Sequence, residues 1–287
     1  MAQHITTNDG VRLAWEAAGP EDGPAVVLIH GWSGSRRYFD RNAPALAAGG
    51  CRVVRYDQRS HGESDAPPHG HHVARLAADL RDVLAALDVR DATLVGTSMG
   101  CAVIWSYVEL FGLERVSRVV WVDQAPLQNR APGWELGSRG IYDEASLAAL
   151  RATLDGEGGL DAVADGNTAV CLSLPLPADV AALLRAETMR CDPRALGALM
   201  ADHTQLDWRP LLPLVACPAL NVVGGTSGCF PVEGCLTNDE LAPHCCSVLF
   251  KRANHWLYLE QPEAFNALLL DFVARGNEGR PKRDEVA

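Results

Sequence analysis

The stretch Ala92-Thr93-Leu94-Val95-Gly96-Thr97-Ser98-Met99-Gly100 decides the fold of this 287-residue chain. Its first four residues are a short apolar run typical of a buried strand, and after Gly100 apolar residues recur at helical spacing up to Phe111. The stretch therefore predicts a strand, a tight turn and a helix, with Ser98 on the turn. Glycines two residues before and after Ser98 let neighbouring chain pass without a Cβ clash, so the hydroxyl can stand clear of the backbone.

A serine in this context is a candidate nucleophile, although a structural turn serine is the plainer alternative. A hydroxyl needs a base to take its proton, and His255 is our candidate because it follows a predicted strand and precedes the last predicted helix. The histidines at 69, 71 and 72 could suggest a metal site, but they lie in a Pro/Gly-rich stretch without a carboxylate or cysteine partner. We expect a solvated loop there.

Outward from Ser98, short apolar runs alternate with helical periods, which predicts βα units and a largely parallel sheet. Asp9-Gly10 lies between two alternating stretches near the start, which indicates a small antiparallel hairpin. The other predicted strands are Ala25–Ile29, Cys51–Tyr56, Ala92–Val95, Val119–Val122, Ala219–Val223 and Ser247–Phe250, and the main helices begin near Val73, Val103 and Pro262.

One segment breaks this alternation. Residues 124–213 contain no convincing strand, only helical pieces at Ala145–Leu154, Pro177–Met189 and Pro193–Thr204. We expect a helical cap over the carboxyl ends of the strands, where ligands of open parallel sheets bind. The predicted division is a core of residues 1–123 and 214–275, a cap of residues 124–213, and a flexible tail of residues 276–287.

Composition narrows the function classes. The chain has 25 Lys+Arg against 36 Asp+Glu, a formal charge of −11. An acidic protein is a poor partner for nucleic acid or an anionic membrane. No apolar run approaches the roughly 20 residues of a transmembrane span, and no signal-peptide pattern opens the chain, so we expect a cytoplasmic protein. The nine cysteines have no even framework and are expected to be reduced; Cys245-Cys246 lacks a second ligand pair for zinc.

Four stretches carry a resemblance over nearly the whole chain, from Ile5 to Ala274. They are His30-Gly31-Trp32-Ser33-Gly34, the segment Tyr56–Asp65, Gly96–Gly100, and Asn254-His255-Trp256. In these stretches the chain resembles the α/β-hydrolase fold superfamily. The residues of its Tyr-Asp-Gln-Arg and Gly-x-Ser-Met-Gly motifs are similar to those of the branch of esterases, lactonases and cofactor-free haloperoxidases. The resemblance implies an α/β fold with a mostly parallel eight-stranded sheet flanked by helices and a cap.

The resemblance also implies roles for individual residues. It places the oxyanion hole at the backbone N–H groups of Trp32 and Met99, and an aromatic substrate pocket at Trp32 and Trp256. We expect Trp134 to join that pocket, with ordinary packing inside the cap as the open alternative. The resemblance implies neither an organic cofactor nor a metal. It makes the Asp57 segment a structural brace, for which we expect an ion pair with Arg59.

The third member of the expected catalytic triad departs from the family pattern. Relatives carry an Asp four residues before a Pro in the loop after the strand at Ala219–Val223, and here Ser227 occupies that place. A neutral serine cannot stabilise an imidazolium. We expect Asp123, which follows the preceding strand, to supply the acid. The alternatives are Glu233 or Asp239, or a degraded triad in which Asp123 only caps a turn.

These residues predict a serine hydrolase that cleaves a small or medium, largely apolar ester or lactone through an acyl-enzyme. Two rivals remain at the level of sequence. One is a cofactor-independent oxygenase or C–C lyase in which His255 and Asp123 form a base dyad. The other is a small-molecule receptor with little turnover. The expected partner is a small-molecule substrate, and a homodimer is an open alternative to a monomer.

Overall fold

The computed structural model describes residues 3–287. The predicted core begins at residue 1, and its first two residues, Met1 and Ala2, lie outside the described residues. One sheet runs through the molecule in the order β1-β2-β4-β3-β5-β6-β7-β8-β9. Its strands are β1 Gln3–Thr6, β2 Arg12–Ala18, β3 Ala25–Ile29, β4 Arg52–Tyr56, β5 Ala92–Thr97, β6 Val116–Val122, β7 Ala219–Gly224, β8 Cys245–Phe250 and β9 Arg283–Val286.

The sheet is antiparallel only at its first edge. β1 pairs with β2 and β2 with β4 in antiparallel register, whereas every pairing from β4 through β3 to β9 is parallel. The hairpin at Asp9-Gly10 is confirmed, with Gly10 at φ +86°. The strands β3, β5 and β7 are almost entirely buried along their length, as expected for a parallel sheet covered on both faces.

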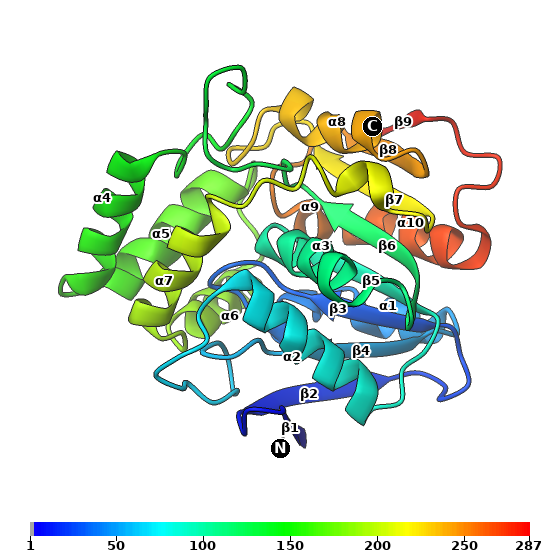
Figure 1. Cartoon of the computed structure of the whole chain (residues 1–287), viewed down its shortest axis with the longest axis horizontal. Helices are drawn as coiled ribbons and strands as arrows, with labels where there is room; N and C mark the ends of the chain where they lie inside the picture. Colours follow the sequence, from blue (N-terminus) through cyan, green and yellow to red (C-terminus); the bar gives the residue numbers. More distant parts are fainter. Residues whose placement is uncertain (1–2) are drawn as a thin grey trace.

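Helices cover both faces of the sheet (Figure 1). On one face α2 and α3 pack over residues such as Val27, Leu94 and Val119. On the other face α1, α9 and α10 pack over Val26, Val95 and Val248. The helices are α1 Ala43–Ala48, α2 Val73–Ala86, α3 Met99–Phe111, α8 Val232–Leu241, α9 Leu257–Glu260 and α10 Pro262–Arg275, with short 3-10 turns η1 Arg36–Phe39 and η2 Leu212–Leu214.

Four helices between β6 and β7 gather to one side of the sheet, at the left of Figure 1. They are α4 Glu144–Asp155, α5 Gly159–Cys171, α6 Ala178–Thr188 and α7 Pro193–His203. Three of them match the helical pieces predicted from the sequence; α5 was not predicted, because its Gly166 and Asn167 interrupt the apolar period. Two of these helices begin at residues with capping side chains. Asp143 and Ser146 form a reciprocal capping box at the start of α4, and the Asp192 side chain caps the start of α7.

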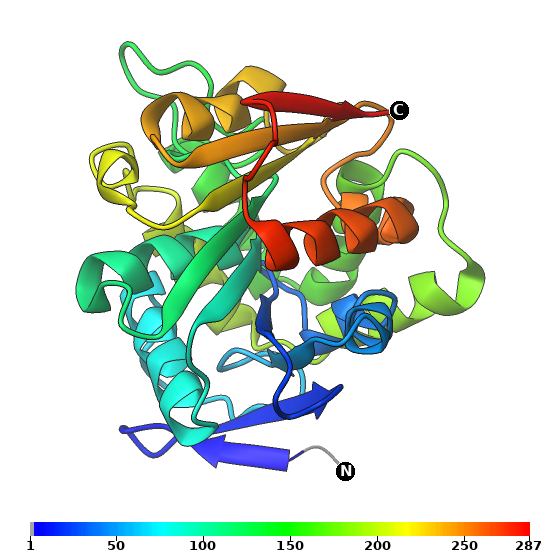
Figure 2. The same ribbon diagram turned by 90° about the vertical axis from the view of Figure 1, so that its right-hand side faces the viewer.

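The expectation of eight strands and a flexible tail is corrected at the C-terminus. Residues Arg283–Val286 add a ninth strand that runs parallel to β8, at the upper edge of the sheet in Figure 2. The tail carries a single apolar residue in this strand, Val286, which packs against the core, and one apolar residue among charged ones did not predict a strand. Backbone hydrogen bonds to β8 and ion pairs add to this contact: Arg283 bonds Asp239 at 2.9 Å, and Lys251 pairs with Glu285.

The expected ion pair of Asp57 with Arg59 is wrong. Asp57 pairs with Arg36, and Arg59 pairs with Asp79 at 2.6 Å and with Asp9 at 3.0 Å. The chain turns between Asp57 and Arg59, so that the two side chains enter different parts of the interior. Over the described residues, no helix is both long and apolar enough to cross a membrane.

Candidate active site

Ser98 stands between β5 and α3 on a strained turn. Its φ of +53° is a left-handed value that non-glycine residues rarely adopt. A Cβ on Gly96 would lie 2.4 Å from the Gly100 carbonyl oxygen, and a Cβ on Gly100 would lie 2.4 Å from that of Ile29. Both contacts are with backbone, so the two glycines are what allows this close crossing of strand and helix. The turn lifts the half-buried Ser98 to the edge of a cavity.

Asp123 and His255 meet beside it. Asp123 follows β6 at φ +50°, and its Oδ2 lies 2.7 Å from His255 Nδ1. Asp123 is fully buried and the imidazole is 5% exposed. The same Oδ2 accepts a hydrogen bond from Ser227 Oγ at 2.6 Å, while Oδ1 accepts one from the Gly224 N–H at 2.8 Å. The serine that replaces the usual acid therefore supports the carboxylate that comes from the neighbouring strand.

The other carboxylates proposed for this role lie elsewhere. Asp239 is engaged with Arg283 on the far side of α8, and Glu233 is exposed at the start of that helix. Asp123 is thus the carboxylate that the structure brings to His255. If Asp123 capped the turn that follows it, its carboxylate would accept a hydrogen bond from a backbone N–H of the next few residues. Among the described residues it instead accepts from Gly224 on β7 and from Ser227 in the loop after β7.

The carboxylate changes the proton affinity of the base. Burial disfavours the charged imidazolium, yet the adjoining Cys229 side chain and the Asp123 carboxylate outweigh it, so that the pKa of His255 is raised above its ordinary value. We attribute the rise to Asp123, because the hydrogen bond with Cys171, together with burial, keeps the pKa of the Cys229 thiol well above its usual range and the thiol therefore uncharged. Since Nδ1 bonds Asp123, the free nitrogen of His255 is Nε2.

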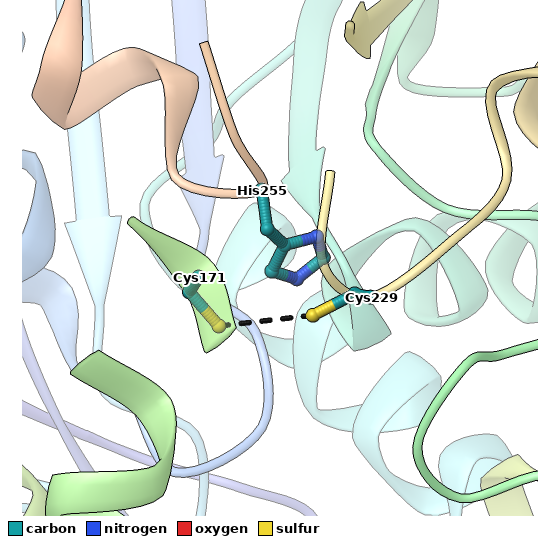
Figure 3. Close-up of side chains that lie close together, drawn as sticks. All are labelled: Cys171, Cys229 and His255. Carbon is teal, nitrogen blue, oxygen red and sulfur yellow. Dashed lines mark hydrogen bonds between the residues drawn. The ribbon is translucent and has the colours of Figure 1, made fainter. Parts of the chain in front are cut away.

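Nε2 is not bonded to the serine in this structure. Within residues 3–287 the Ser98 hydroxyl makes no hydrogen bond to His255, although both side chains line one cavity. Bonds of this kind are often long in ligand-free enzymes and shorten when substrate binds. The nearest side chains to the free edge of the imidazole include Cys229 (Figure 3).

Two backbone N–H groups are available for an oxyanion. Met99 is the first residue of α3, and the first N–H groups of a helix have no partner within it. The Trp32 N–H donates to no acceptor within the described part of the chain. His30 Nδ1 lies 2.8 Å from the Gly31 carbonyl, and its Nε2 accepts from the Gln58 N–H at 3.0 Å. The Gly31 C=O and the Trp32 N–H belong to the same trans peptide and point in opposite directions. Because His30 holds the Gly31 C=O, the Trp32 N–H points away from His30.

The cavity above Ser98 has a volume of about 290 Å³ and lies between the sheet and helices α4, α5 and α7. Within the described residues its lining includes no Asp, Glu, Lys or Arg. Most of the lining is apolar, including Trp32, Val163, Ile141, Met200, Phe230 and Trp256. The Trp32 indole also donates to the Leu196 carbonyl at 2.9 Å, so this side chain both lines the cavity and anchors α7.

The pocket assignment of Trp134 is wrong. Its ring packs with Leu127 and Phe230 in a separate cluster, its indole donates to the Leu127 carbonyl at 3.0 Å, and Arg209 stacks on it. A tryptophan in a predicted cap gives no signal about which way it faces, so sequence alone could not decide this. Trp256 does line the cavity, edge-on to Tyr38.

Sequence reasoning missed three residues of the site. Asn254 accepts from both the His255 N–H and the Gly228 N–H at 2.7 Å, which holds the base loop against the Ser227 loop. Its position directly before His255 was the available signal. Cys171 and Cys229 also reach the cavity, and no spacing in the sequence relates them to each other or to His255.

Comparisons with known proteins agree with the fold described above. Residues 24–146 match the family described as alpha/beta hydrolase fold. The chain is 37% identical over 155 residues to a non-heme chloroperoxidase of Streptomyces lividans, a match that covers 52% of this chain and only about half (55%) of that protein. It is 26% identical to a pimeloyl-[acyl-carrier protein] methyl ester esterase of Vibrio cholerae, over 92% of this chain and 98% of that one. An esterase structure from Exiguobacterium antarcticum superposes with a TM-score of 0.87 at 23% identity, over 96% of this chain and 100% of the other.

Proposed function

The chain has the α/β-hydrolase fold, and we propose that it is a serine hydrolase that cleaves small, uncharged esters or lactones through an acyl-enzyme. One observation carries the proposal: His255 Nδ1 lies 2.7 Å from a buried carboxylate, while its free edge faces the cavity that Ser98 enters on a positive-φ turn. The nucleophile, the acid and the base then follow the ends of β5, β6 and β8, with β7 between the last two strands.

The first half of the reaction forms the acyl-enzyme. Ser98 Oγ attacks the carbonyl carbon of the substrate, and His255 Nε2 takes the hydroxyl proton. The developing oxyanion is held by the N–H groups of Trp32 and Met99, each of which is worth roughly 2.7–4 kcal/mol of barrier in such sites. Asp123 keeps Nδ1 protonated and stabilises the imidazolium.

The second half releases both products. The leaving alkoxide takes the proton from His255 and departs. Water then attacks the acyl carbon, His255 Nε2 accepts its proton, and Ser98 leaves with that proton to restore the free hydroxyl. The reaction uses no redox step, so this proposal requires neither a cofactor nor a metal.

The cavity supports the substrate class. A volume of about 290 Å³ lies at the small end of the roughly 300–1,000 Å³ typical of ligand pockets. Its lining offers hydroxyl and amide groups but no Asp, Glu, Lys or Arg within residues 3–287, so a charged acyl chain would be buried without a partner. The name of the Vibrio cholerae relative, a methyl ester esterase, supports ester hydrolysis, whereas the Streptomyces lividans relative is named a chloroperoxidase.

Release of p-nitrophenol from short-chain p-nitrophenyl esters tests the proposal. We expect the wild type to turn over, and both Ser98→Ala and His255→Ala to lose about 10⁴-fold or more in kcat. If Ser98→Ala kept most of the activity while His255→Ala lost it, the His255–Asp123 pair would be acting as a base dyad on the substrate. If the wild type bound small esters without turnover, the receptor alternative would hold.

Two wider features belong to the same proposal. The partner is a small molecule rather than nucleic acid or membrane, which the formal charge of −11 supports, and the oligomeric state stays open between monomer and homodimer. We place the protein in the cytoplasm, because all nine cysteines are free thiols and a reducing compartment keeps them so.

A further inference from the structure

Two thiols and the base share the wall of the cavity. Cys171 Sγ lies 3.7 Å from Cys229 Sγ, and both sulfurs lie within 4.8 Å of an imidazole nitrogen of His255. Figure 3 shows the two thiols converging below the ring, on the side away from its backbone. All three residues line the cavity, so a small ion can reach them from the substrate side. The proposed hydrolysis uses His255 and leaves both thiols without a role.

We propose that Cys171, Cys229 and His255 form a binding site for a thiophilic divalent cation of the zinc class, and that occupation of this site reversibly switches off the hydrolase. Binding of the cation is inferred from the geometry of the three side chains. Inhibition rests on the proposed function, because it requires His255 to be the base.

The spacing of the sulfurs fits tetrahedral coordination. The ion replaces the protons of the two thiols, which are released to solvent, so binding should tighten as pH rises. With Zn–S bonds of about 2.3 Å, the two resulting thiolates of a tetrahedral site stand about 3.8 Å apart. The observed 3.7 Å already meets that requirement without movement of either backbone. Two sulfurs and one imidazole leave a fourth position, which the cavity supplies to water or to a ligand group.

The histidine is held as metal-binding histidines are held. Such ligands donate their second ring N–H to a carboxylate, which fixes the ring and its tautomer, and Asp123 fills that place at 2.7 Å from Nδ1. The bond leaves Nε2 free as the ligand atom. Ser227 and Gly224 in turn hold the carboxylate, so the outer shell is complete.

Both cysteines are anchored at the backbone. The Cys229 carbonyl accepts from the Arg139 N–H at 2.8 Å, and its own N–H donates to Ser227 Oγ at 3.2 Å. The Cys171 carbonyl, at the end of α5, accepts from the Trp256 N–H at 3.1 Å. Because the ligands are fixed before the ion arrives, little ordering opposes binding.

Occupation of the site excludes catalysis for a simple reason. The lone pair on His255 Nε2 that would bind the cation is the same lone pair that must accept the Ser98 proton. A cation held there also joins α5 of the cap to the loop after β7. Soft thiolate ligands favour zinc-class ions, whereas Mg²⁺ and Ca²⁺ require oxygen ligands, so inhibition should discriminate between these ions.

Cobalt binding tests the site without reference to activity. The full chain is kept reduced with a non-thiol reductant and titrated with Co²⁺, and the sulfur-to-cobalt charge-transfer absorption is followed. We expect one ion per chain and displacement by Zn²⁺. Cys171→Ser, Cys229→Ser and His255→Ala should each weaken binding by at least about 100-fold, since even the loss of an outer-shell partner costs 10–100-fold. The matched control is Cys246→Ser, another thiol that is half-buried but lies away from the cavity, and it should bind as the wild type does.

Ester hydrolysis tests the switch. Each variant is compared with its own metal-free rate. Zn²⁺ should inhibit wild type and Cys246→Ser at the concentration at which it displaces Co²⁺, a chelator should restore the rate, and Cys229→Ser should need at least about 100-fold more Zn²⁺. Mg²⁺ should have no effect on any of them.

Three results would overturn the proposal. Binding that is unchanged by all three substitutions would place the ion elsewhere, and equal inhibition by Mg²⁺ would remove the role of sulfur. Inhibition reversed by reductant but not by chelator would mean a Cys171–Cys229 disulfide instead of a bound ion. If the protein hydrolysed no ester while Co²⁺ bound through these three residues, the proposed function would fail and the site would stand.

Discussion

Asp123 accepts four hydrogen bonds: three come from groups on the neighbouring strand β7 and on the loops beyond it, and the fourth is a long one from the Cys235 thiol of α8 to Oδ1 at 3.9 Å. His255 Nδ1 and Ser227 Oγ reach one oxygen, and the Gly224 N–H reaches the other. A hydrogen bond to an ionised group contributes about 1.5–3 kcal/mol. Under the proposed function, the role that the family pattern gives to one aspartate is divided here between a carboxylate that follows β6 and a hydroxyl in the loop after β7.

This division predicts a graded loss on substitution. Asp123→Asn removes the charge that stabilises the imidazolium and should lower kcat by about 10⁴-fold. Ser227→Ala leaves the charge in place and removes one hydrogen bond to it, so we expect a loss of about tenfold. Steady-state rates on a p-nitrophenyl ester measure both.

The double variant Asp123→Asn, Ser227→Asp is the sharper comparison. It returns the carboxylate to the position that relatives use, and we expect it to recover a part of the activity lost in Asp123→Asn. Equal losses in Ser227→Ala and Asp123→Asn would contradict the division of roles.

The raised pKa of His255 predicts the pH dependence of the rate. The base works only as the neutral imidazole, so the wild-type rate should rise with pH and level off above the His255 pKa. In Asp123→Asn the carboxylate no longer stabilises the imidazolium, while burial still opposes the charge. The pKa of His255 should therefore fall, and the rise of the rate with pH should occur at lower pH than in the wild type. A pH–kcat/KM profile of both proteins measures the shift, and an unmoved limb would mean that Asp123 does not act on His255.

The same group links stability to pH. A raised pKa in the fold means that the native state binds the proton more tightly than the unfolded chain does. The contribution is therefore complete below the unfolded value of about 6.5 and is lost as pH rises through the higher folded value.

At the scale of elements, the junction of β5 and α3 depends on the absence of a side chain at two positions. A methyl group at Gly100 would lie 2.4 Å from the Ile29 carbonyl oxygen. That oxygen belongs to the backbone, so the clash cannot be relieved by a change of side-chain rotamer. The strand–turn–helix unit that exposes Ser98 is thus locked to β3 by close contact.

Gly100→Ala should therefore destabilise the protein by about 2 kcal/mol or more, the range of overpacking in a dense core. Gly140→Ala is the matched control, because a Cβ there would meet no atom within 4 Å and its φ is not in the left-handed region. Urea unfolding of the two variants gives the difference in free energy. A Gly100→Ala protein as stable as the control would show that the junction tolerates displacement.

At the scale of the whole molecule, buried ion pairs tie the first hairpin to the helices. Arg59 is fully buried between Asp79 on α2 and Asp9 in the hairpin turn. Burial of an arginine is tolerable only while both the charge and its hydrogen bonds are matched.

Asp79→Asn should cost about 3–5 kcal/mol of unfolding free energy, because it leaves a buried guanidinium short of a charge. Asp161→Asn removes one partner from the exposed pair with Arg185 and should cost less than about 1 kcal/mol. Thermal unfolding of both variants checks the contrast, and similar shifts would mean that water reaches Arg59.

The mostly apolar cavity predicts the substrate selectivity of the proposed hydrolase. The p-nitrophenyl ester of a neutral four-carbon acid should be cleaved at least about 100-fold more efficiently than that of the matching dicarboxylic acid monoester, since burying an unpaired carboxylate costs several kcal/mol. Comparison of kcat/KM for the two esters measures this. Equal values would mean that a positive charge in the cavity, for which the His255 imidazolium is the candidate, compensates the carboxylate, and would contradict the predicted selectivity.

Sequence patterns predicted most of the fold because the signals were local. Apolar runs marked the parallel strands, and the glycines around Ser98 marked the turn. Contacts between residues far apart in the sequence were harder to predict: Asp57 pairs with Arg36, and β9 is held by the Arg283 ion pair together with one apolar residue, Val286. The Cys171–Cys229–His255 cluster joins three distant segments, and only the folded chain brings them together.

The central claim is that Ser98 is a nucleophile activated by His255. The most direct measurement is mass spectrometry of the protein after treatment with a serine-directed phosphonate, with the modified peptide sequenced. We predict one adduct on Ser98 in the wild type, and a labelling rate in His255→Ala that falls by orders of magnitude. Absence of the adduct in folded wild type, or its appearance on Cys229 in place of Ser98, would contradict the account.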